Sequence, residues 1–122
     1  MSQKTIILVQ HPLACDLIVI AVGTIYSLGV WTVKPGKESE FIRAWNDFAR
    51  WTRDTQDGAK DAVLLQDIAN PQKFVSFGPW RDLKNTEAWR KTQEFRNAFA
   101  RFKDLCSDIQ PNTLKCVVSI GE

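Results

Sequence analysis

The chain has 122 residues, of which 44% are hydrophobic and 25% charged, and its formal net charge at pH 7 is +2. This length accommodates one domain with a single hydrophobic core. Acidic and basic residues are interleaved with no basic tract, which argues against a nucleic-acid-binding protein. Cys15, Cys106 and Cys116 form no CxxC pair, which argues against a zinc site or a disulfide framework and favours reduced thiols in a cytoplasmic protein.

Residues 1–23 are predicted to form an N-terminal arm or extra strands. Residues 6–22 are largely apolar, but Pro12 and Asp16 interrupt them. The run therefore falls short of the roughly 20 clean apolar residues of a membrane-spanning helix. The basic start and cleavage site of a signal peptide are present only in a weak form. We expect two short strands, residues 6–9 and 17–22, that pack on the domain or on a partner subunit.

The predicted domain covers residues 24–122, and its first strand is residues 24–33. Both faces of this strand are largely apolar, with Ile25, Trp31 and Val33 on one face and Tyr26, Leu28 and Val30 on the other. A sheet with helices on one side and water on the other alternates more cleanly between apolar and polar residues. We therefore expect the second face to be covered as well, and a second copy of the sheet would cover it.

Residues 37–55 are predicted to form a helix after the Pro35-Gly36 break. Four residues recur at helical spacing on its apolar face: Phe41, Trp45, Phe48 and Thr52. Acidic residues near its start and arginines near its end suit the helix dipole. Asp57-Gly58 is predicted to end it, because glycine readily adopts positive φ.

A hairpin is predicted next, with strands at 62–68 and 74–80 joined by a turn at 70–73 that contains Asn70-Pro71. Asp82 is a good N-cap for the helical pattern that continues to about residue 107, either as two helices or as one bent helix. That pattern carries one apolar stripe, formed by Phe95, Phe99, Phe102 and Cys106.

The end of the chain is predicted to form a loop at 108–112, where Pro111 blocks helix continuation, and a last strand at 114–120. The complete order is strand, helix, strand, strand, helix, strand. This is the order of the ferredoxin-like split βαβ plan, an α+β fold with an antiparallel sheet.

Several short segments carry a family resemblance through their order and spacing. They are Val33-Lys34-Pro35-Gly36 followed by Phe41 and Trp45, Leu64-Leu65-Gln66-Asp67 with Asn70-Pro71, Phe74-Val75-Ser76 with Trp80, and Ala88-Trp89 with Glu94-Phe95. Together they resemble the antibiotic biosynthesis monooxygenase (ABM) domain family over about residues 24–120. The resemblance implies a dimeric α+β barrel in which two sheets face each other, with a pocket between each sheet and its helices.

The resemblance implies one of two chemistries, and the first is cofactor-independent oxygenation of polycyclic phenols. In that chemistry the protein contributes binding, deprotonation and a dry pocket. Family members of this type use an Asn and a Trp one helical turn apart, and Asn85 and Trp89 match that spacing, which places them on one helix face. The Tyr expected about six residues after the Trp is Phe95 here, which removes a hydroxyl group from the site.

The second chemistry is oxidative haem degradation, which the residues disfavour. The Asn, Trp and His positions that this chemistry uses fall by spacing on Gly29, Trp89 and Phe99, so that only the Trp is present. Phe99 cannot ligate iron, and the single histidine, His11, lies in the N-terminal arm. We therefore expect no metal and no cofactor.

Each candidate site residue also has a structural interpretation. Asn85 could hydrogen-bond a substrate oxygen, or it could bond locally in the first turn of its helix. Trp89 could wall a pocket or pack in the core. Trp45 and Phe41 could line the same cavity, although core packing is the favoured alternative. Trp31 could face the pocket or the partner sheet, and Trp80 is interpreted as structural.

Two functional hypotheses follow. In the first, a monooxygenase-like homodimer binds a flat, apolar, phenolic molecule, with Asn85 hydrogen-bonded to the substrate oxygen, Trp89 stacked on the ring or beside it, and Phe95 and Phe99 excluding water. In the second, a non-catalytic small-molecule-binding or stress-response dimer uses the same scaffold. A cavity lined by Asn85 and Trp89 and large enough for two rings would favour the first hypothesis, and its occupation by Phe95 and Phe99 would favour the second.

Overall fold

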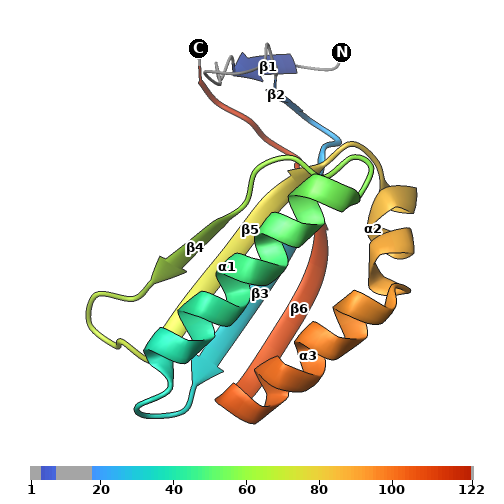
Figure 1. Cartoon of the computed structure of the whole chain (residues 1–122). Helices are drawn as coiled ribbons and strands as arrows, with labels where there is room; N and C mark the ends of the chain where they lie inside the picture. Colours follow the sequence, from blue (N-terminus) through green and yellow to red (C-terminus); the bar gives the residue numbers. More distant parts are fainter. Residues whose placement is uncertain (1–3, 8–17, 122) are drawn as a thin grey trace.

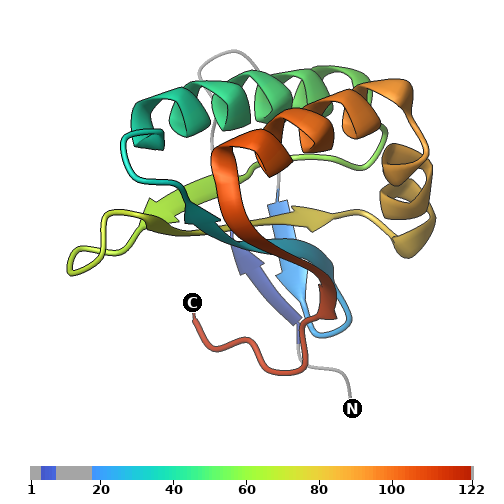
Figure 2. The ribbon, with the colours of Figure 1, turned by 90° about the horizontal axis from the view of Figure 1, so that it is seen from below.

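The computed structural model describes residues 4–7 and 18–121. The domain is a four-stranded antiparallel sheet with α1 and α3 side by side across one face and α2 at one end (Figures 1 and 2). Its elements are β3 (Ile25–Val33), α1 (Glu38–Thr55), β4 (Val63–Gln66), β5 (Lys73–Trp80), α2 (Leu83–Arg90), α3 (Gln93–Leu105) and β6 (Cys106–Lys115). The spatial strand order is β4-β5-β3-β6. This topology confirms the predicted ferredoxin-like α+β fold.

The N-terminal part contains β1 (Lys4–Ile7) and β2 (Ile18–Ala21), which pair antiparallel as a sheet of their own. Two short strands are therefore confirmed, although the first begins before residue 6. Residues 8, 9 and 17 of the predicted strands, and His11 and Cys15, lie outside the described residues. The division of the chain at residue 23 stays a prediction. No helix in the described part of the chain is long and apolar enough to cross a bilayer.

The helices α2 and α3 begin at side-chain caps that their sequences supply. The Asp82 carboxylate accepts a hydrogen bond from the Asn85 backbone N–H at 3.0 Å, which confirms Asp82 as the N-cap of α2. The Thr92 hydroxyl accepts from the Phe95 N–H at 3.1 Å and starts α3. This second cap divides the predicted helical segment into two helices. Gly58 follows α1 with a φ of 78°, the positive value that the sequence predicts there.

The last strand differs from the prediction. β6 runs over Cys106–Lys115 without interruption, where a loop was predicted at 108–112, and no regular secondary structure follows up to residue 121. β6 is an edge strand that pairs only with β3, and Pro111 lies opposite Gly29. A proline on an edge strand removes no hydrogen bond from the interior of a sheet. Pro111 therefore does not interrupt the strand, and the predicted loop and strand bounds are wrong.

The hydrophobic core lies between the sheet and the two long helices. Phe41 of α1 is at its centre and packs against Trp31, Phe74 and Phe102, with ring centroids 5.2, 5.1 and 5.7 Å away. All four rings are buried. These contacts join α1, α3 and the two central strands, so that the core fixes the helices over the sheet.

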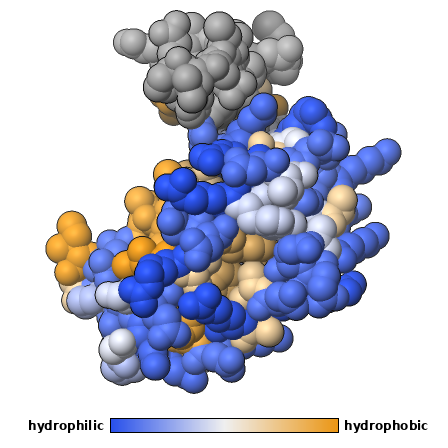
Figure 3. All heavy atoms as spheres, viewed as in Figure 1, coloured by the Kyte–Doolittle hydropathy of each residue, from blue (hydrophilic) through white to orange (hydrophobic). Residues whose placement is uncertain are grey.

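The opposite face of the sheet is not covered by a helix of the described chain (Figure 2). Leu28 of β3 pairs with Phe77 of β5, and Tyr26 pairs with Leu114 of β6, so these four apolar side chains share that face. We call them the open-face cluster. Other apolar side chains are exposed at the sheet edge over β4 and the hairpin that follows it, among them Leu65 and Ile68 (Figure 3).

The thiol of Cys106 is expected to be unreactive in the folded protein. Burial raises its pKa from the ordinary 9.0 to about 11, although nearby Lys34 acts in the opposite direction. Below pH 9 the thiolate fraction is then about 100-fold lower than for an unperturbed thiol. In a Cys15→Ser variant titrated with Ellman's reagent at pH 8, half-buried Cys116 should react in the native state and Cys106 only after unfolding. Equal reaction rates of the two thiols would contradict this expectation.

Candidate functional site

A cavity of about 90 Å³ lies between the sheet and the helices. Its floor consists of small residues that alternate along the helix-facing side of the strands and of a proline on the edge strand: Ser27, Gly29, Ser76, Gly78 and Pro111. Because these positions carry short or compact side chains, space that larger residues would fill stays open. A Cβ atom at Gly29 would meet the Trp31 indole at 2.8 Å, so glycine is required for this ring to lie over the strand.

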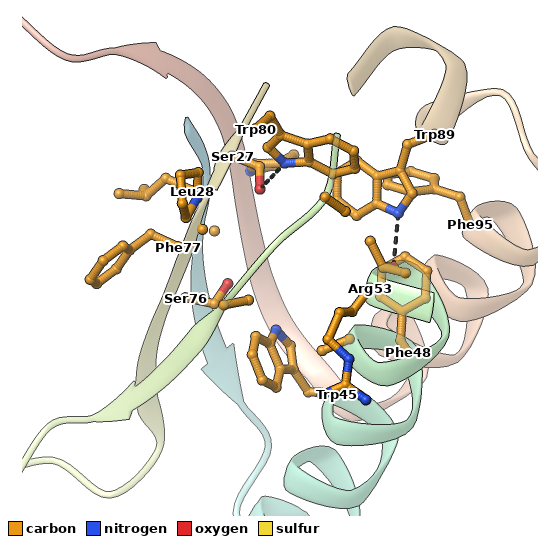
Figure 4. A pocket seen from close by; sticks show the side chains of 18 of the residues that line it. Ser27, Leu28, Trp45, Phe48, Arg53, Ser76, Phe77, Trp80, Trp89 and Phe95 are labelled. Atoms are coloured by element: carbon orange, nitrogen blue, oxygen red, sulfur yellow. Dashed lines mark hydrogen bonds between the residues drawn. The ribbon is translucent and has the colours of Figure 1, made fainter. Parts of the chain in front are cut away.

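The walls of the cavity are aromatic (Figure 4). They are formed by Trp31, Trp45, Phe48, Trp80, Trp89, Phe95 and Phe99. Phe48 and Trp89 are stacked with ring centroids 5.7 Å apart, and Phe95 and Phe99 are stacked at 4.3 Å. Flat, apolar walls of this kind suit a flat, apolar ligand.

Three of the cavity tryptophans donate their indole N–H to a hydroxyl oxygen. Trp31 donates to Ser76, Trp80 to Ser27 and Trp89 to Thr52, and the distance from indole nitrogen to hydroxyl oxygen is 3.0 Å in each pair. Figure 4 shows the bonds of Trp80 and Trp89 as dashed lines. Each bond joins two different elements, and together they fix the orientation of the three indole rings.

Charged residues lie where the cavity meets solvent. Arg53, Lys60, Asp61 and Arg90 contribute to its lining there. The Arg53 side chain is exposed and its Nε lies 2.9 Å from the carboxylate of Asp54. Hydrogen bonding to that carboxylate raises the pKa of the Arg53 guanidinium. The rim therefore carries three basic side chains and one acidic side chain around an apolar interior.

The structure brings together five of the seven predicted site residues. Trp31, Trp45, Trp89, Phe95 and Phe99 all line the cavity. Phe41 does not, because it is fully buried in the core. Asn85 is not among the lining residues either, since its side-chain amide lies against Gly58. The Asn85 Oδ1 atom is buried and has no hydrogen-bond partner in the described chain.

Several cavity residues do not appear among the predicted site residues. Trp80 lines the cavity in addition to packing at the strand end. The three hydroxyl groups that accept from the indoles, on Ser27, Thr52 and Ser76, are also new. A signal for the floor was present in the sequence, because small residues occupy alternate positions, at Ser27 and Gly29 and at Ser76 and Gly78.

The size of the cavity limits what it can hold in this conformation. A volume of about 90 Å³ is smaller than the apolar cavity of about 150 Å³ that accommodates benzene in another protein. A molecule with two fused rings therefore requires side chains at the rim or in the roof to move. Phe95 and Phe99 line the cavity from α3.

Comparison with known proteins identifies the family and the fold. A family model described as antibiotic biosynthesis monooxygenase matches residues 24–101. SnoaB, a cofactor-independent oxygenase from Streptomyces nogalater, has a similar structure, with 16% identity, a TM-score of 0.74 and coverage of 82% of this chain and 99% of its own. A conserved protein from Methanosarcina mazei Go1 is also similar, with 19% identity, a TM-score of 0.70 and coverage of 78% and 94%.

A protein from Pseudomonas aeruginosa gives 19% identity, a TM-score of 0.68 and coverage of 79% of this chain and 96% of its own. At these identities the structural likeness establishes the fold alone. A search among curated proteins gives no match.

Proposed function

Because the chain belongs to the antibiotic biosynthesis monooxygenase family, we propose that it binds a flat, apolar, aromatic small molecule between its sheet and its helices. The aromatic-walled cavity carries this proposal, since its floor of small residues leaves a space between the aromatic side chains of its walls. A flat ligand there would stack on ring faces.

The reaction that we propose is oxygenation of a phenolic ligand to a quinone without a cofactor, and the structurally similar SnoaB is described as a cofactor-independent oxygenase. One atom of O2 becomes the new carbonyl oxygen, the other leaves as water with the O–H and ring C–H hydrogens, and the ligand itself supplies the two electrons. Trp89 packs against the ligand ring. Phe95 and Phe99 exclude water, so solvent screens less of the negative charge that develops on the ligand oxygen. Asn85 accepts a hydrogen bond from the phenolic hydroxyl through its unpartnered Oδ1 atom. For this contact the turn at Gly58, which lies against the Asn85 amide, has to shift.

A homodimer is part of the same proposal, and so is a cytoplasmic location. The open-face cluster is an apolar surface in the middle of the sheet, which a second copy would cover. Cysteines without a disulfide pattern suit a reducing compartment.

The proposal is tested by oxygen consumption with bicyclic and tricyclic phenols. We expect Asn85→Ala and Trp89→Phe to lower kcat/KM by about 10- to 100-fold, because each removes a contact to the ligand. Trp51→Phe is the matched control: Trp51 stacks on Phe48 at 6.0 Å but does not line the cavity. Equal rates in wild type and in all three variants would refute the site assignment.

The size of the cavity favours one alternative, a non-catalytic small-molecule-binding or stress-response dimer. Phe95 stands where the resemblance implies a Tyr, and the cavity of about 90 Å³ holds no two-ring ligand without rearrangement. Saturable binding of an aromatic ligand without oxygen consumption would establish this alternative over the enzymatic function.

A further inference from the structure

The hydroxyl groups of the cavity suggest what kind of ligand oxygen it recognises, an inference that rests on the function proposed above. We propose that Ser27, Thr52 and Ser76 are specificity-determining donors, whose O–H groups bind a carbonyl or phenolate oxygen on the flat ligand. The three residues come from β3, α1 and β5, so they reach the cavity from the floor and from the roof.

In each of these hydroxyls one acceptor position is occupied and the O–H donor is free. Each oxygen accepts an indole N–H at 3.0 Å, and none of the three donates a hydrogen bond to a protein acceptor in the described chain. Other hydroxyls of the same fold behave differently: those of Thr55, Thr86 and Thr92 each donate to a backbone carbonyl one turn earlier. A hydroxyl carries one donor and two acceptor positions.

Burial makes the free donors significant. Ser76 and Thr52 are only 7% and 9% exposed, so bulk water has little access to them. A buried donor without an acceptor is unfavourable, and a ligand that supplies the acceptor removes this cost. The indole N–H also polarises each hydroxyl, because hydrogen bonds in a chain strengthen one another in a low-dielectric interior.

The same arrangement defines the ligand class. The indole N–H groups of Trp31, Trp80 and Trp89 already donate to the hydroxyls. In each indole–hydroxyl pair the O–H group is therefore the donor that is left for a ligand. They match a ligand oxygen that accepts, such as that of an aromatic ketone, a quinone or a phenolate. A hydrocarbon of the same shape would leave the donors unpaired and bind more weakly.

Two commercial probes separate these cases, 1-indanone and indane, which share a bicyclic carbon frame and differ by one carbonyl group. Protein labelled with ¹⁵N at tryptophan is titrated with each probe, and dissociation constants are taken from the indole N–H signals. We expect wild type to bind 1-indanone about 10-fold more tightly than indane. The indole signals should shift further with the ketone, because a hydroxyl that donates becomes a better acceptor.

Substitutions assign this preference to residues. Thr52→Val keeps the side-chain shape and removes the hydroxyl. It should lower the preference for the ketone, measured as the dissociation constant of indane divided by that of 1-indanone, by about 3- to 10-fold. Ser27→Ala and Ser76→Ala should act in the same direction, whereas Thr52→Ser should restore most of the preference. Thr86→Val is the matched control, because the Thr86 hydroxyl is buried but bonds to the Leu83 carbonyl outside the cavity.

The outcomes distinguish this inference from the function on which it rests. Equal binding of the two probes to wild type, or an unchanged ratio in Thr52→Val, would overturn the inference and leave the aromatic cavity as a binding site. Binding of neither probe would overturn the proposed function together with the inference. If a serine variant does not fold, the inference is still tested by the ratio of dissociation constants in the wild type and in the Thr52→Val and Thr52→Ser variants.

Discussion

A Phe41→Ala variant is expected to lose about 3–5 kcal/mol of free energy of unfolding. Phe41 has 0% exposure and packs on Trp31, Phe74 and Phe102. Removing its ring opens a cavity where α1, α3 and the sheet meet, and these rigid elements cannot collapse fully into it. Urea denaturation followed by tryptophan fluorescence, at a fixed protein concentration, measures the loss.

The neighbouring residue supplies the control. Ile42 lies next to Phe41 on α1, but it is 42% exposed on the outer side of the helix. Ile42→Ala should cost less than about 1 kcal/mol, since it removes little buried surface and alanine favours the helix. Equal losses in the two variants would mean that Phe41 is not at the centre of the core.

Most of the fold could be predicted from periodic patterns, because residues that pack in the core must be apolar and must recur at the spacing of their helix or strand. Phe41 and its helical repeat belong to α1, which begins one residue from the predicted start. Asp82 caps α2 as expected. β6 was mispredicted at Pro111 because the effect of a proline depends on whether its strand is central or at the edge. That position is a property of the assembled sheet.

The candidate site was predictable only in part, for a related reason. Helical spacing places Asn85 and Trp89 on one face of α2, yet only Trp89 lines the cavity. The turn at Gly58 lies against the Asn85 amide, and nothing in the spacing of α2 fixes where that turn goes. The pairing of Trp89 with Thr52 is equally hidden, because the two residues are 37 positions apart in the sequence.

The open-face cluster follows from a pattern that the sequence does contain. Apolar residues on both faces of the first strand predict two covered faces, and the helices of the described chain cover only one. Tyr26 and Leu28 therefore lie on a face of the sheet that no helix of the described chain covers. Partial burial on this face nevertheless raises the pKa of the Tyr26 phenol above its usual value.

We expect Phe77→Lys to convert the proposed homodimer into a monomer and to raise the dimer dissociation constant by at least about 100-fold. Phe77 is the β5 member of the open-face cluster, opposite Leu28 and with its ring centroid 6.4 Å from that of Tyr26. Phe77 is among the residues that line the cavity, but Figure 4 shows its ring pointing away from it, so the substituted side chain lies on the open face of the sheet. In a two-fold symmetric dimer each substitution occurs twice, and both ammonium groups would be buried without a partner.

Sedimentation velocity measures this effect, since one chain of 13.9 kDa is readily distinguished from two. Ile68→Lys is the matched control, because Ile68 is fully exposed at the hairpin beyond β4 and outside the open-face cluster. It introduces the same charge and should leave the mass unchanged. A wild type that sediments as a single chain, or a Phe77→Lys variant that stays dimeric, would show that the open-face cluster is not the contact between two copies.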